Sequence, residues 1–436
     1  MANASLKMDK EPLGAQDASG GYQLSAVDAP VVPPGYKLTE VGVIPEDWEV
    51  KSLGSVLHRG RLGGNYQNQD AETSKPLMKM GNISRGSMEL EKVQYVPGNI
   101  TPGPEHRLQA GDVLFNTRNT LDLVGKVAMW RDELPVAYYN SNLMRLEFNP
   151  DEICSNAYAN YALNSTSSIA RLRGIATGTT SVAAIYTRDL LQLPLLIPKK
   201  TEQRAIATAL SDVDALVAKL DALIAKKRDL KQAAMQQLLT GQTRLPGFSG
   251  EWKVKRLRDA ADVVMGQSPA GTSYNRIGIG SPLINGPTEF TDKHPIKIQW
   301  TSEPTKFCQK GDLLLCVRGS STGRINSADD EYCIGRGVAA IRAKPDADTS
   351  FITYQVHSAI PSILAATTGS TFPNIDGKSI RTIAIPLPSP DEQIAIASIL
   401  YDMDAEIAAL EARRDKTRLL KHGMMQELLT GRIRLV

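Results

Sequence analysis

The chain is poor in the residues that build metal and redox centres. It has four cysteines, Cys154, Cys308, Cys316 and Cys333, and none of them forms a Cys-x-x-Cys pair. Its five histidines are widely scattered, without a His-Glu-x-x-His or a mixed Cys/His ligand spacing. We therefore interpret the cysteines as small, reduced core residues and expect no metal site.

Long apolar runs are also missing. No window approaches the roughly 18 apolar residues of a membrane span. The N-terminus lacks a basic segment followed by an apolar one, so a cytoplasmic protein is expected. Residues 1–34 are rich in Ala, Gly, Asp, Ser and Pro without periodicity, which predicts a disordered tail.

Fragments of catalytic motifs occur, but each is incomplete. Gly377-Lys-Ser379 lacks the earlier glycine of a phosphate-binding loop, because Phe372 stands there. Gly278-Ile-Gly280 and Gly335-Arg-Gly337 lack the third glycine of a dinucleotide fingerprint and are typical of turns. Phe148-Asn-Pro-Asp151 is one residue short of the motif by which amino-group methyltransferases hold an amine, and no cofactor-binding glycine cluster accompanies it. The sequence predicts no enzyme.

The composition is that of a folded protein with more than one domain. The chain has 436 residues, of which 42% are hydrophobic, and this length suggests two to three domains. A net charge of +3 and a pI of about 8.5 are compatible with a nucleic-acid partner without identifying one.

One long segment occurs twice. Residues 202–245 and 392–435 align without a gap at an offset of 190, and roughly half of the positions are identical. Fainter repeats precede each copy: the segment around Trp48 returns around Trp252, and Gly111-Asp returns as Gly311-Asp. Because the long segments are kept and the parts before them have diverged, the chain is expected to present two different recognition surfaces on one scaffold.

The repeat predicts an α+β fold with an internal pseudo-twofold repeat. Two globular domains are expected, each followed by a long helix, and the two helices should form an antiparallel coiled coil with the domains at opposite ends. The expected segments are domain 1 (35–200), helix 1 (201–241), domain 2 (242–390) and helix 2 (391–436). The apolar seam steps by four and three residues, as in coiled coils; its members are Ile206, Leu210, Val213, Val217, Leu220 and Ile224, and Ile396, Leu400, Met403, Ile407 and Leu410. In the alternative, each helix packs back on its own domain.

Polar, glycine-marked loops are the candidate DNA contacts, because Arg, Lys, Asn, Ser and Thr bond phosphates and base edges. In domain 1 the candidates are Lys79, Asn82, Arg85, Asn116, Arg118, Asn119, Arg171, Arg173, Thr179 and Thr180. In domain 2 they are Asn285, Arg318, Ser320, Ser321, Arg324, Ser370, Thr371 and Asn374. Any solvated loop contains such residues, but Arg118 and Arg318 occupy the same place, seven residues after the repeated glycine.

The sequence resembles the specificity subunit of type I restriction-modification systems over about residues 35–436. Each long helix begins with Pro-x-x-x-Glu-Gln, at 198–203 and 388–393, and closes with Leu-Leu-Thr-Gly, at 238–241 and 428–431. The resemblance implies two target-recognition domains that read the two halves of a bipartite site in double-stranded DNA, with an unread spacer between them.

The resemblance also implies partners. They are two methyltransferase (M) subunits and restriction/translocase (R) subunits, which would carry S-adenosylmethionine, ATP and Mg, with no cofactor in this chain. A different class of function stays open, a coiled-coil adaptor with two protein-binding heads. A fused modification enzyme is disfavoured because methyltransferase motifs are missing. Since the repeat is circular in pattern, residues near 43 are expected to lie close to Val436.

Overall fold

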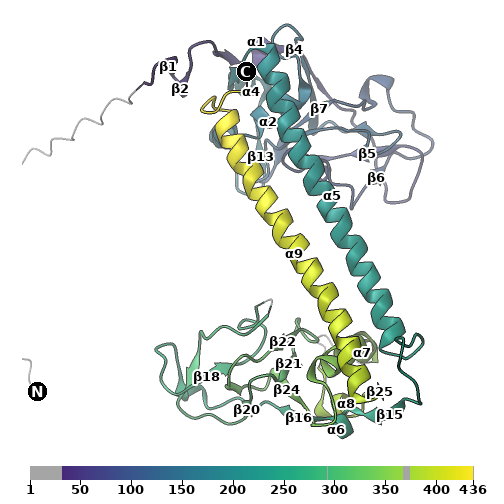
Figure 1. Cartoon of the computed structure of the whole chain (residues 1–436). Coiled ribbons are helices and arrows are strands. Elements are labelled where there is room, and N and C mark those ends of the chain that lie inside the picture. Colours follow the sequence, from purple (N-terminus) through teal and green to yellow (C-terminus); the bar gives the residue numbers. More distant parts are fainter. Residues whose placement is uncertain (1–31, 292, 367–373, 436) are drawn as a thin grey trace, which may run out of the picture. The chain divides into compact units, whose positions relative to one another are not determined.

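The structure is a computed structural model that describes residues 32–291, 293–366 and 374–435 (Figure 1). It divides into two compact units, and the predicted tail lies outside the described residues except for 32–34. Unit 1 comprises Met1–Ser211 and His422–Val436, and unit 2 comprises Asp212–Lys421. Both division points fall inside the long helices, so each long helix contributes one part to each unit.

Unit 1 is a mixed α+β body. Its strands are β1 (Tyr36–Thr39), β2 (Gly42–Pro45), β3 (Glu49–Ser52), β4 (Leu57–Leu62), β5 (Pro76–Met78), β6 (Gln94–Tyr95), β7 (Val113–Asn116), β8 (Arg118–Asn119), β9 (Val127–Met129), β10 (Tyr138–Tyr139), β11 (Leu143–Phe148), β12 (Thr177–Gly178), β13 (Ala183–Ala184) and β14 (Pro194–Ile197). Its helices are α1 (Leu53–Val56), α2 (Asn156–Leu163), α3 (Thr166–Ile175), α4 (Thr187–Leu190) and the start of α5 (Lys200–Leu238), with 3-10 turns η1 (Met80–Asn82) and η2 (Pro104–His106).

Unit 2 is also a mixed α+β body. Its strands are β15 (Lys253–Arg256), β16 (Ala261–Met265), β17 (Tyr274–Asn275), β18 (Ser281–Ile284), β19 (Trp300–Thr301), β20 (Phe307–Cys308), β21 (Leu313–Cys316), β22 (Ile325–Ser327), β23 (Tyr332–Ile334), β24 (Val338–Ala343) and β25 (Ala384–Leu387). Its helices are α6 (Leu257–Ala260), α7 (Thr349–Ala366), α8 (Gly377–Arg381) and most of α9 (Pro390–Leu428), with the 3-10 turn η3 (Gly271–Ser273).

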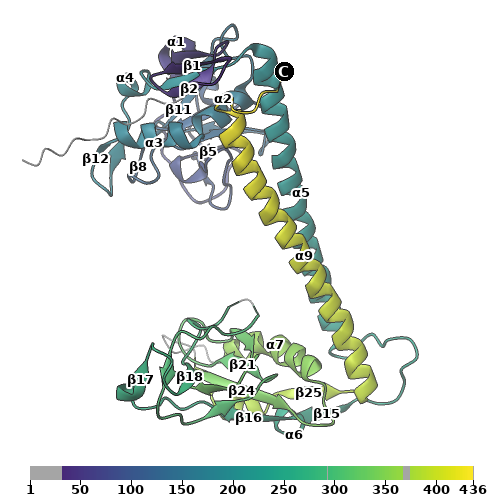
Figure 2. The ribbon, with the colours of Figure 1, turned by 60° about the vertical axis from the view of Figure 1, so that its left-hand side comes forward.

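The central sheets of the two units have the same topology. Unit 1 has the order β4-β11-β7-β9 and unit 2 the order β16-β24-β21-β22, antiparallel throughout. In each unit the strand before the first short helix, α1 or α6, also pairs with the strand that precedes the long helix: β3 pairs with β14, and β15 pairs with β25. Figure 2 shows β15 and β25 side by side. The faint repeat in the sequence is therefore a repeat of the fold.

The aspartate of the repeated Gly-Asp pair stabilises the central sheet of each unit. Oδ2 of Asp112 accepts a hydrogen bond from the backbone N–H of Gln109 (3.0 Å), which closes the turn before β7, and pairs with Arg145 on β11 (3.2 Å). Burial raises the pKa of Asp112. In unit 2, Asp312 pairs in the same way with Arg342 on β24 (2.8 Å). The sequence retains this pair because it fixes a turn and a strand register.

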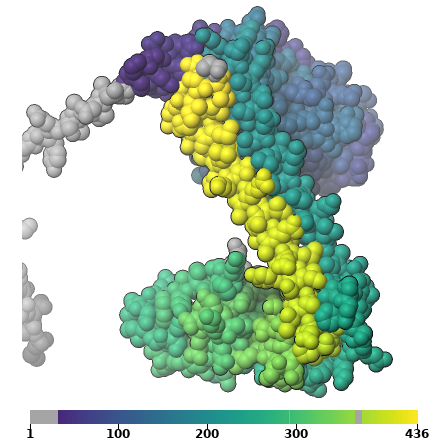
Figure 3. Space-filling view, viewed as in Figure 1, coloured from purple at the N-terminus to yellow at the C-terminus, as the bar shows by residue number. Residues whose placement is uncertain are grey.

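The long helices run in opposite directions within unit 2. Lys231 pairs with Asp404, Lys227 with Glu406, and Arg418 with Asp221, so positions on α9 rise as positions on α5 fall. Figure 3 shows these parts of α5 (teal) and α9 (yellow) in contact. These ion pairs are partly exposed, and each contributes at most about 1 kcal/mol. The second helix ends at Leu428 instead of continuing through the predicted 391–436, because a turn with Gly431 at φ +73° follows.

The predicted seam residues lie on the covered sides of α5 and α9. Buried ones are Ile206, Leu210, Leu220, Ile224, Ile396, Leu400 and Ile407, and partly buried ones are Val213, Val217, Met403 and Leu410. At the start of each helix the seam merges with a domain core: Ile206 packs with Trp48 and Leu428 in unit 1, and Ile396 packs with Leu238 in unit 2.

A buried glutamate at the start of each long helix joins it to the end of the other copy. In unit 1, Glu202 is fully buried and accepts hydrogen bonds from Nε1 of Trp48 (2.9 Å) and from Nε and Nη2 of Arg434 (2.7 and 2.8 Å). Arg434 also pairs with Asp47 (2.9 Å). We call Trp48, Glu202 and Arg434 the unit 1 clasp. Val436, for which the prediction was made, lies outside the described residues; Arg434 pairs with Asp47, close to the segment around residue 43.

Unit 2 contains an equivalent set, the unit 2 clasp of Trp252, Glu392 and Arg244. Glu392 is 1% exposed and accepts from Trp252 (3.1 Å) and from Arg244 (2.6 and 2.7 Å). The glycine of Leu-Leu-Thr-Gly lies against the same tryptophan: a Cβ on Gly431 would come 3.3 Å from Trp48, and one on Gly241 3.2 Å from Trp252.

The glutamine of each Pro-x-x-x-Glu-Gln phrase also has a structural role. Nε2 of Gln203 donates to the carbonyls of Pro198 (3.0 Å) and Glu152 (2.8 Å), and its Oε1 accepts from the backbone of Cys154 (3.0 Å). Gln393 makes the corresponding contact with Pro388 in unit 2 (3.0 Å). The two repeated phrases therefore attach each helix to its domain.

The described residues can be searched for membrane-spanning helices, metal-ligand groups and disulfides. No helix among them is long and apolar enough to cross a membrane, and no group of three or more His, Cys, Asp or Glu within them could hold a metal ion. All four cysteines are free; three are buried and Cys154 is half-buried. Burial raises the pKa of Cys308 to about 12, as expected for a core thiol.

Candidate nucleic-acid interface

In unit 1 a small sheet gathers candidates that are distant in sequence. β8 carries Arg118 and Asn119 and pairs with β13, which pairs with β12, and Thr179 and Thr180 form the turn between these last two strands. The N–H of Leu121 donates to the carbonyl of Thr180 (3.2 Å), which ties the turn to β8. Arg118 and both threonines are exposed, so the sheet presents one cation and two hydroxyls to solvent.

Arg85 and Arg173 form a second positive feature of unit 1. Arg85 has a buried Nη1 without a hydrogen-bond partner among the described residues. Burial lowers the pKa of Arg85, and repulsion from Arg173 lowers it further. Arg173 is exposed at the end of α3, and Arg171 on the same helix is half-buried. Neither guanidinium has an ion pair with another described residue, and two such groups that repel each other favour an anionic ligand.

Three candidates in unit 1 form hydrogen bonds with other groups of the protein. Nδ2 of Asn82 donates to the carbonyls of Glu89 (2.9 Å) and Lys92 (3.0 Å), and the side chain is 3% exposed. Asn116 is fully buried, and its Oδ1 accepts from the N–H of Arg118 (3.2 Å). Lys79 donates to Gln94 (2.6 Å). We leave the two asparagines out of the proposed interface, because both side chains are buried, although Nδ2 of Asn116 has no hydrogen-bond partner among the described residues.

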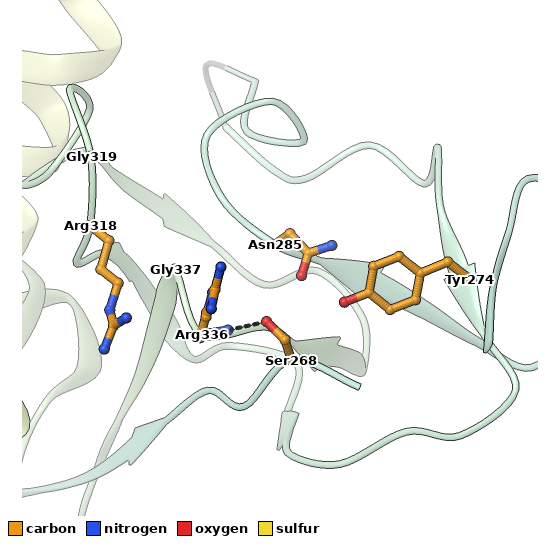
Figure 4. A pocket seen from close by; sticks show the side chains of 7 residues that line it. All are labelled: Ser268, Tyr274, Asn285, Arg318, Gly319, Arg336 and Gly337. Atoms are coloured by element: carbon orange, nitrogen blue, oxygen red, sulfur yellow. Dashed lines mark hydrogen bonds between the residues drawn. The ribbon is translucent and has the colours of Figure 1, made fainter. Parts of the chain in front are cut away.

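In unit 2 a pocket of about 580 Å³ brings Asn285 and Arg318 together with residues that we did not predict (Figure 4). The remaining lining residues are Ser268, Tyr274, Gly319, Arg336 and Gly337. Arg318 and Arg336 are both exposed, and neither guanidinium has an ion pair or a hydrogen bond to another described residue. The Tyr274 hydroxyl points toward Asn285 and Ser268, and the N–H of Arg336 donates to Oγ of Ser268 (3.2 Å).

The other unit 2 candidates differ in whether they lie near Arg318, which lines this pocket. Asn374 lies next to Arg318 through an isolated β-bridge, and Ser320 and Ser321 follow on the same loop. Arg324 instead donates to the carbonyl of Phe290 (3.0 Å) and so holds a neighbouring loop. Ser370 and Thr371 lie outside the described residues.

Arg336 is the main residue that sequence reasoning missed. It stands in Gly335-Arg-Gly337, which we had interpreted only as turn chemistry. A single arginine between two glycines is itself a usable signal, because the absence of neighbouring side chains leaves the guanidinium accessible. Tyr274 carried no comparable signal.

The pocket can bind a polyanion and read its edges. Arginine pairs bidentately with guanine O6 and N7, asparagine pairs with adenine, and hydroxyls accept or donate to either base or to phosphate. Arg118 in unit 1 and Arg318 in unit 2 each follow the equivalent central strand, β7 or β21, so both units present a cation at the same place in the fold.

Comparison with known proteins gives consistent matches. The family described as "type I restriction modification DNA specificity domain" matches residues 45–226 and 249–419. The MjaX type I restriction enzyme specificity subunit of Methanocaldococcus jannaschii is 31% identical over 412 residues, which cover 92% of this chain and 96% of the relative.

Two solved structures share the fold. A chain from a structure on complex assembly and conformational transition of the type I R-M system is 22% identical, with a TM-score of 0.57 over 89% of this chain and 99% of that chain. The S subunit of a type I restriction-modification system from M. genitalium is 17% identical, with a TM-score of 0.55 over 91% of this chain and 99% of that chain.

Proposed function

This chain belongs to the type I restriction modification DNA specificity domain family, and from this premise we propose how its two units read DNA. The chain is the DNA-recognition subunit of a type I restriction-modification complex and not an enzyme in itself. It acts with DNA and with the other subunits of that system. Within that complex, we assign the recognition task to particular segments and residues of the two units.

In this proposal each globular domain reads one half of a bipartite site, residues 35–200 one half and residues 242–390 the other. The observation that carries it is the pair of exposed arginines, Arg118 and Arg318, at equivalent places in two units of equal topology. The loops around them differ: unit 1 has a small sheet, and unit 2 has a pocket with Arg336 and Tyr274. Equivalent scaffolds with unlike loops suit two unlike half-sites.

The remaining segments, 201–241 and 391–436, would form an antiparallel coiled-coil scaffold with pseudo-twofold symmetry. Support comes from the opposed directions of α5 and α9 within unit 2 and from the two equivalent clasps. A scaffold that repeats its features presents equivalent surfaces twice, so we propose that two methyltransferase subunits bind, together with restriction subunits. Because the complex would act on DNA inside the cell, we propose that it is located in the cytoplasm.

Binding of labelled duplexes to the full chain, assembled with its methyltransferase subunit, tests the assignment of the pocket. Arg318→Ala and Arg336→Ala are each expected to weaken binding to the cognate duplex. A phosphate contact would lower the salt slope by about one, and a base contact would relax specificity at one position. Arg258→Ala is the matched control, because Arg258 is 63% exposed on α6 and does not line the pocket.

Two results would contradict this assignment. Unchanged affinity in both pocket variants at several salt concentrations would remove the pocket from the interface. A complex that assembles but binds cognate and scrambled duplexes equally would instead favour an adaptor with protein-binding heads.

A further inference from the structure

Unit 2 exposes a pair of isoleucines that its own core does not use. Among the described residues, Ile277 has the most exposed large apolar side chain, at 78%, and Ile279 is 56% exposed. Both lie on the loop between β17 and β18. Single exposed apolar residues are ordinary on protein surfaces. We call this pair the isoleucine knob, because two side chains on one short loop form a projecting apolar surface.

The loop that carries the knob is held in one conformation. Oδ1 of Asn275 accepts hydrogen bonds from the N–H groups of Ile277 (3.3 Å) and Ile279 (3.0 Å), and its Nδ2 donates to the carbonyl of Ile279 (2.8 Å). Gly280 then adopts φ +85°, and a Cβ there would come 2.1 Å from the carbonyl oxygen of Thr301. Because the loop is ordered in advance, binding through the knob costs little conformational entropy.

Positive charge surrounds the knob. Arg276, directly before Ile277, is exposed and has no ion pair with a described residue. It lines a pocket of about 540 Å³ that also contains Lys297, which pairs with Asp330, and the buried Glu289. On the other side, Tyr274 precedes Asn275 and lines the pocket that holds Arg318 and Arg336. The apolar tip therefore lies directly beside one arginine, and Tyr274 connects it to the pocket of two more, none of which has an ion pair with a described residue; this favours a polyanion over an apolar protein surface.

DNA offers few apolar groups at its edges. In the major groove the thymine 5-methyl group is the one apolar feature that distinguishes one base pair from another. A fixed isoleucine pair beside unpaired arginines can pack on that methyl while the arginines bond phosphates or guanine.

We propose that the half-site read by unit 2 contains a thymine whose 5-methyl group packs against Ile277 and Ile279. This rests on the proposed function, because it assumes that unit 2 reads DNA. It adds one specified contact: the isoleucine knob discriminates thymine from the other bases, and it does so only in the half-site of unit 2.

The test replaces each thymine of the cognate duplex, one at a time, by deoxyuridine, which removes the methyl group and keeps base pairing. Affinity is measured for the complex of the full chain with its methyltransferase subunit. One position in the unit 2 half-site should lose about fourfold in affinity, the factor for removing one buried methyl-sized group. In the double variant Ile277→Ala, Ile279→Ala, the same substitution should have no effect.

The matched control is Val254→Ala, since Val254 is 72% exposed in the same unit but lies on β15. That variant should keep the full sensitivity to deoxyuridine. Thermal unfolding of all variants should agree, because the substituted side chains are exposed.

The outcomes separate the two levels of the proposal. If no single deoxyuridine weakens binding, or if the loss persists in the double alanine variant, the knob does not contact thymine. If that variant fails to assemble with the methyltransferase subunit, the knob docks protein and the proposal is wrong. If the unaltered complex shows no preference for the cognate duplex at all, the proposed function itself fails.

Discussion

Removing Arg434 should loosen unit 1 at the start of α5 and leave unit 2 intact. In the unit 1 clasp, Glu202 is fully buried and accepts hydrogen bonds from Nε1 of Trp48, from two nitrogens of Arg434 and, at 3.4 Å, from the backbone N–H of Leu435. In Arg434→Ala the carboxylate loses both guanidinium donors and keeps Nε1 of Trp48 and the longer bond from the backbone N–H of Leu435. A buried charge that loses its oppositely charged partner is strongly destabilising.

The magnitude depends on the burial of the two partners. Breaking a buried ion pair from one side costs about 3–5 kcal/mol. The Arg434 side chain is 23% exposed, so water can enter where the guanidinium stood, and the lower end, about 3 kcal/mol, is expected. A local opening that becomes easier by this amount speeds amide exchange by about 100-fold.

Hydrogen exchange measured by mass spectrometry on the full chain resolves the effect by segment. Arg434→Ala should accelerate exchange in peptides that contain Trp48 and in the first turns of α5. Arg244→Ala should do the same around Trp252 and α9, because the unit 2 clasp has the same geometry.

The matched control for this experiment is Arg432→Ala, since Arg432 is 64% exposed and pairs only with Glu427 at the surface. It should change exchange very little. Unchanged exchange in Arg434→Ala, or equal acceleration around both tryptophans, would refute the assignment of separate clasps to the two units.

Three further predictions concern the seam, pH and the thiols. Leu220→Asp places a charge at a position that is 4% exposed and should lower the melting temperature, at a cost of several kcal/mol, whereas Leu223→Asp, at a position 39% exposed on the same helix, should not. The hydrogen bond from Arg434 lowers the pKa of Asp47 from 3.8 to about 2. The ionised Asp47 therefore stabilises the folded state fully above pH 4, and this contribution is lost as the pH falls toward 2. Unfolding measured across this pH range should show the loss, and the loss should be smaller in Arg434→Ala. Iodoacetamide should label Cys154 first and Cys308, Cys316 and Cys333 only after unfolding; early labelling of Cys308 would contradict its burial.

The internal repeat allowed the fold to be predicted from the sequence. The contacts that the repeated residues make could be seen only in the structure. In the sequence, Glu202 only marks the start of a long helix as part of the Pro-x-x-x-Glu-Gln phrase. Its partner Arg434 lies 232 residues away, and no local pattern connects two such positions. The circular order of the repeat did predict that the chain's end lies near residue 43, because pairing of the two copies leaves no other place for it.

The candidate site was less predictable. Arg118 and Arg318 could be chosen because they recur after the same strand, and both are exposed. Asn82 and Asn116 were chosen as loop residues, yet both are buried, because asparagine bonds backbone groups within tight loops as readily as it bonds a ligand. Arg336 was missed because its place depends on strand pairing between β18 and β23, which the sequence does not show.

Exchange of one domain, read out by the pattern of DNA methylation, tests most directly whether each unit reads its own half-site. The chain is expressed with its methyltransferase subunit, and methylated positions across the host genome define the recognised sequence. Replacing residues 242–390 by the equivalent segment of a relative should change one half of that bipartite sequence and leave the other half and its methylation intact. A change in both halves, or in neither, would contradict the assignment of one half-site to each unit.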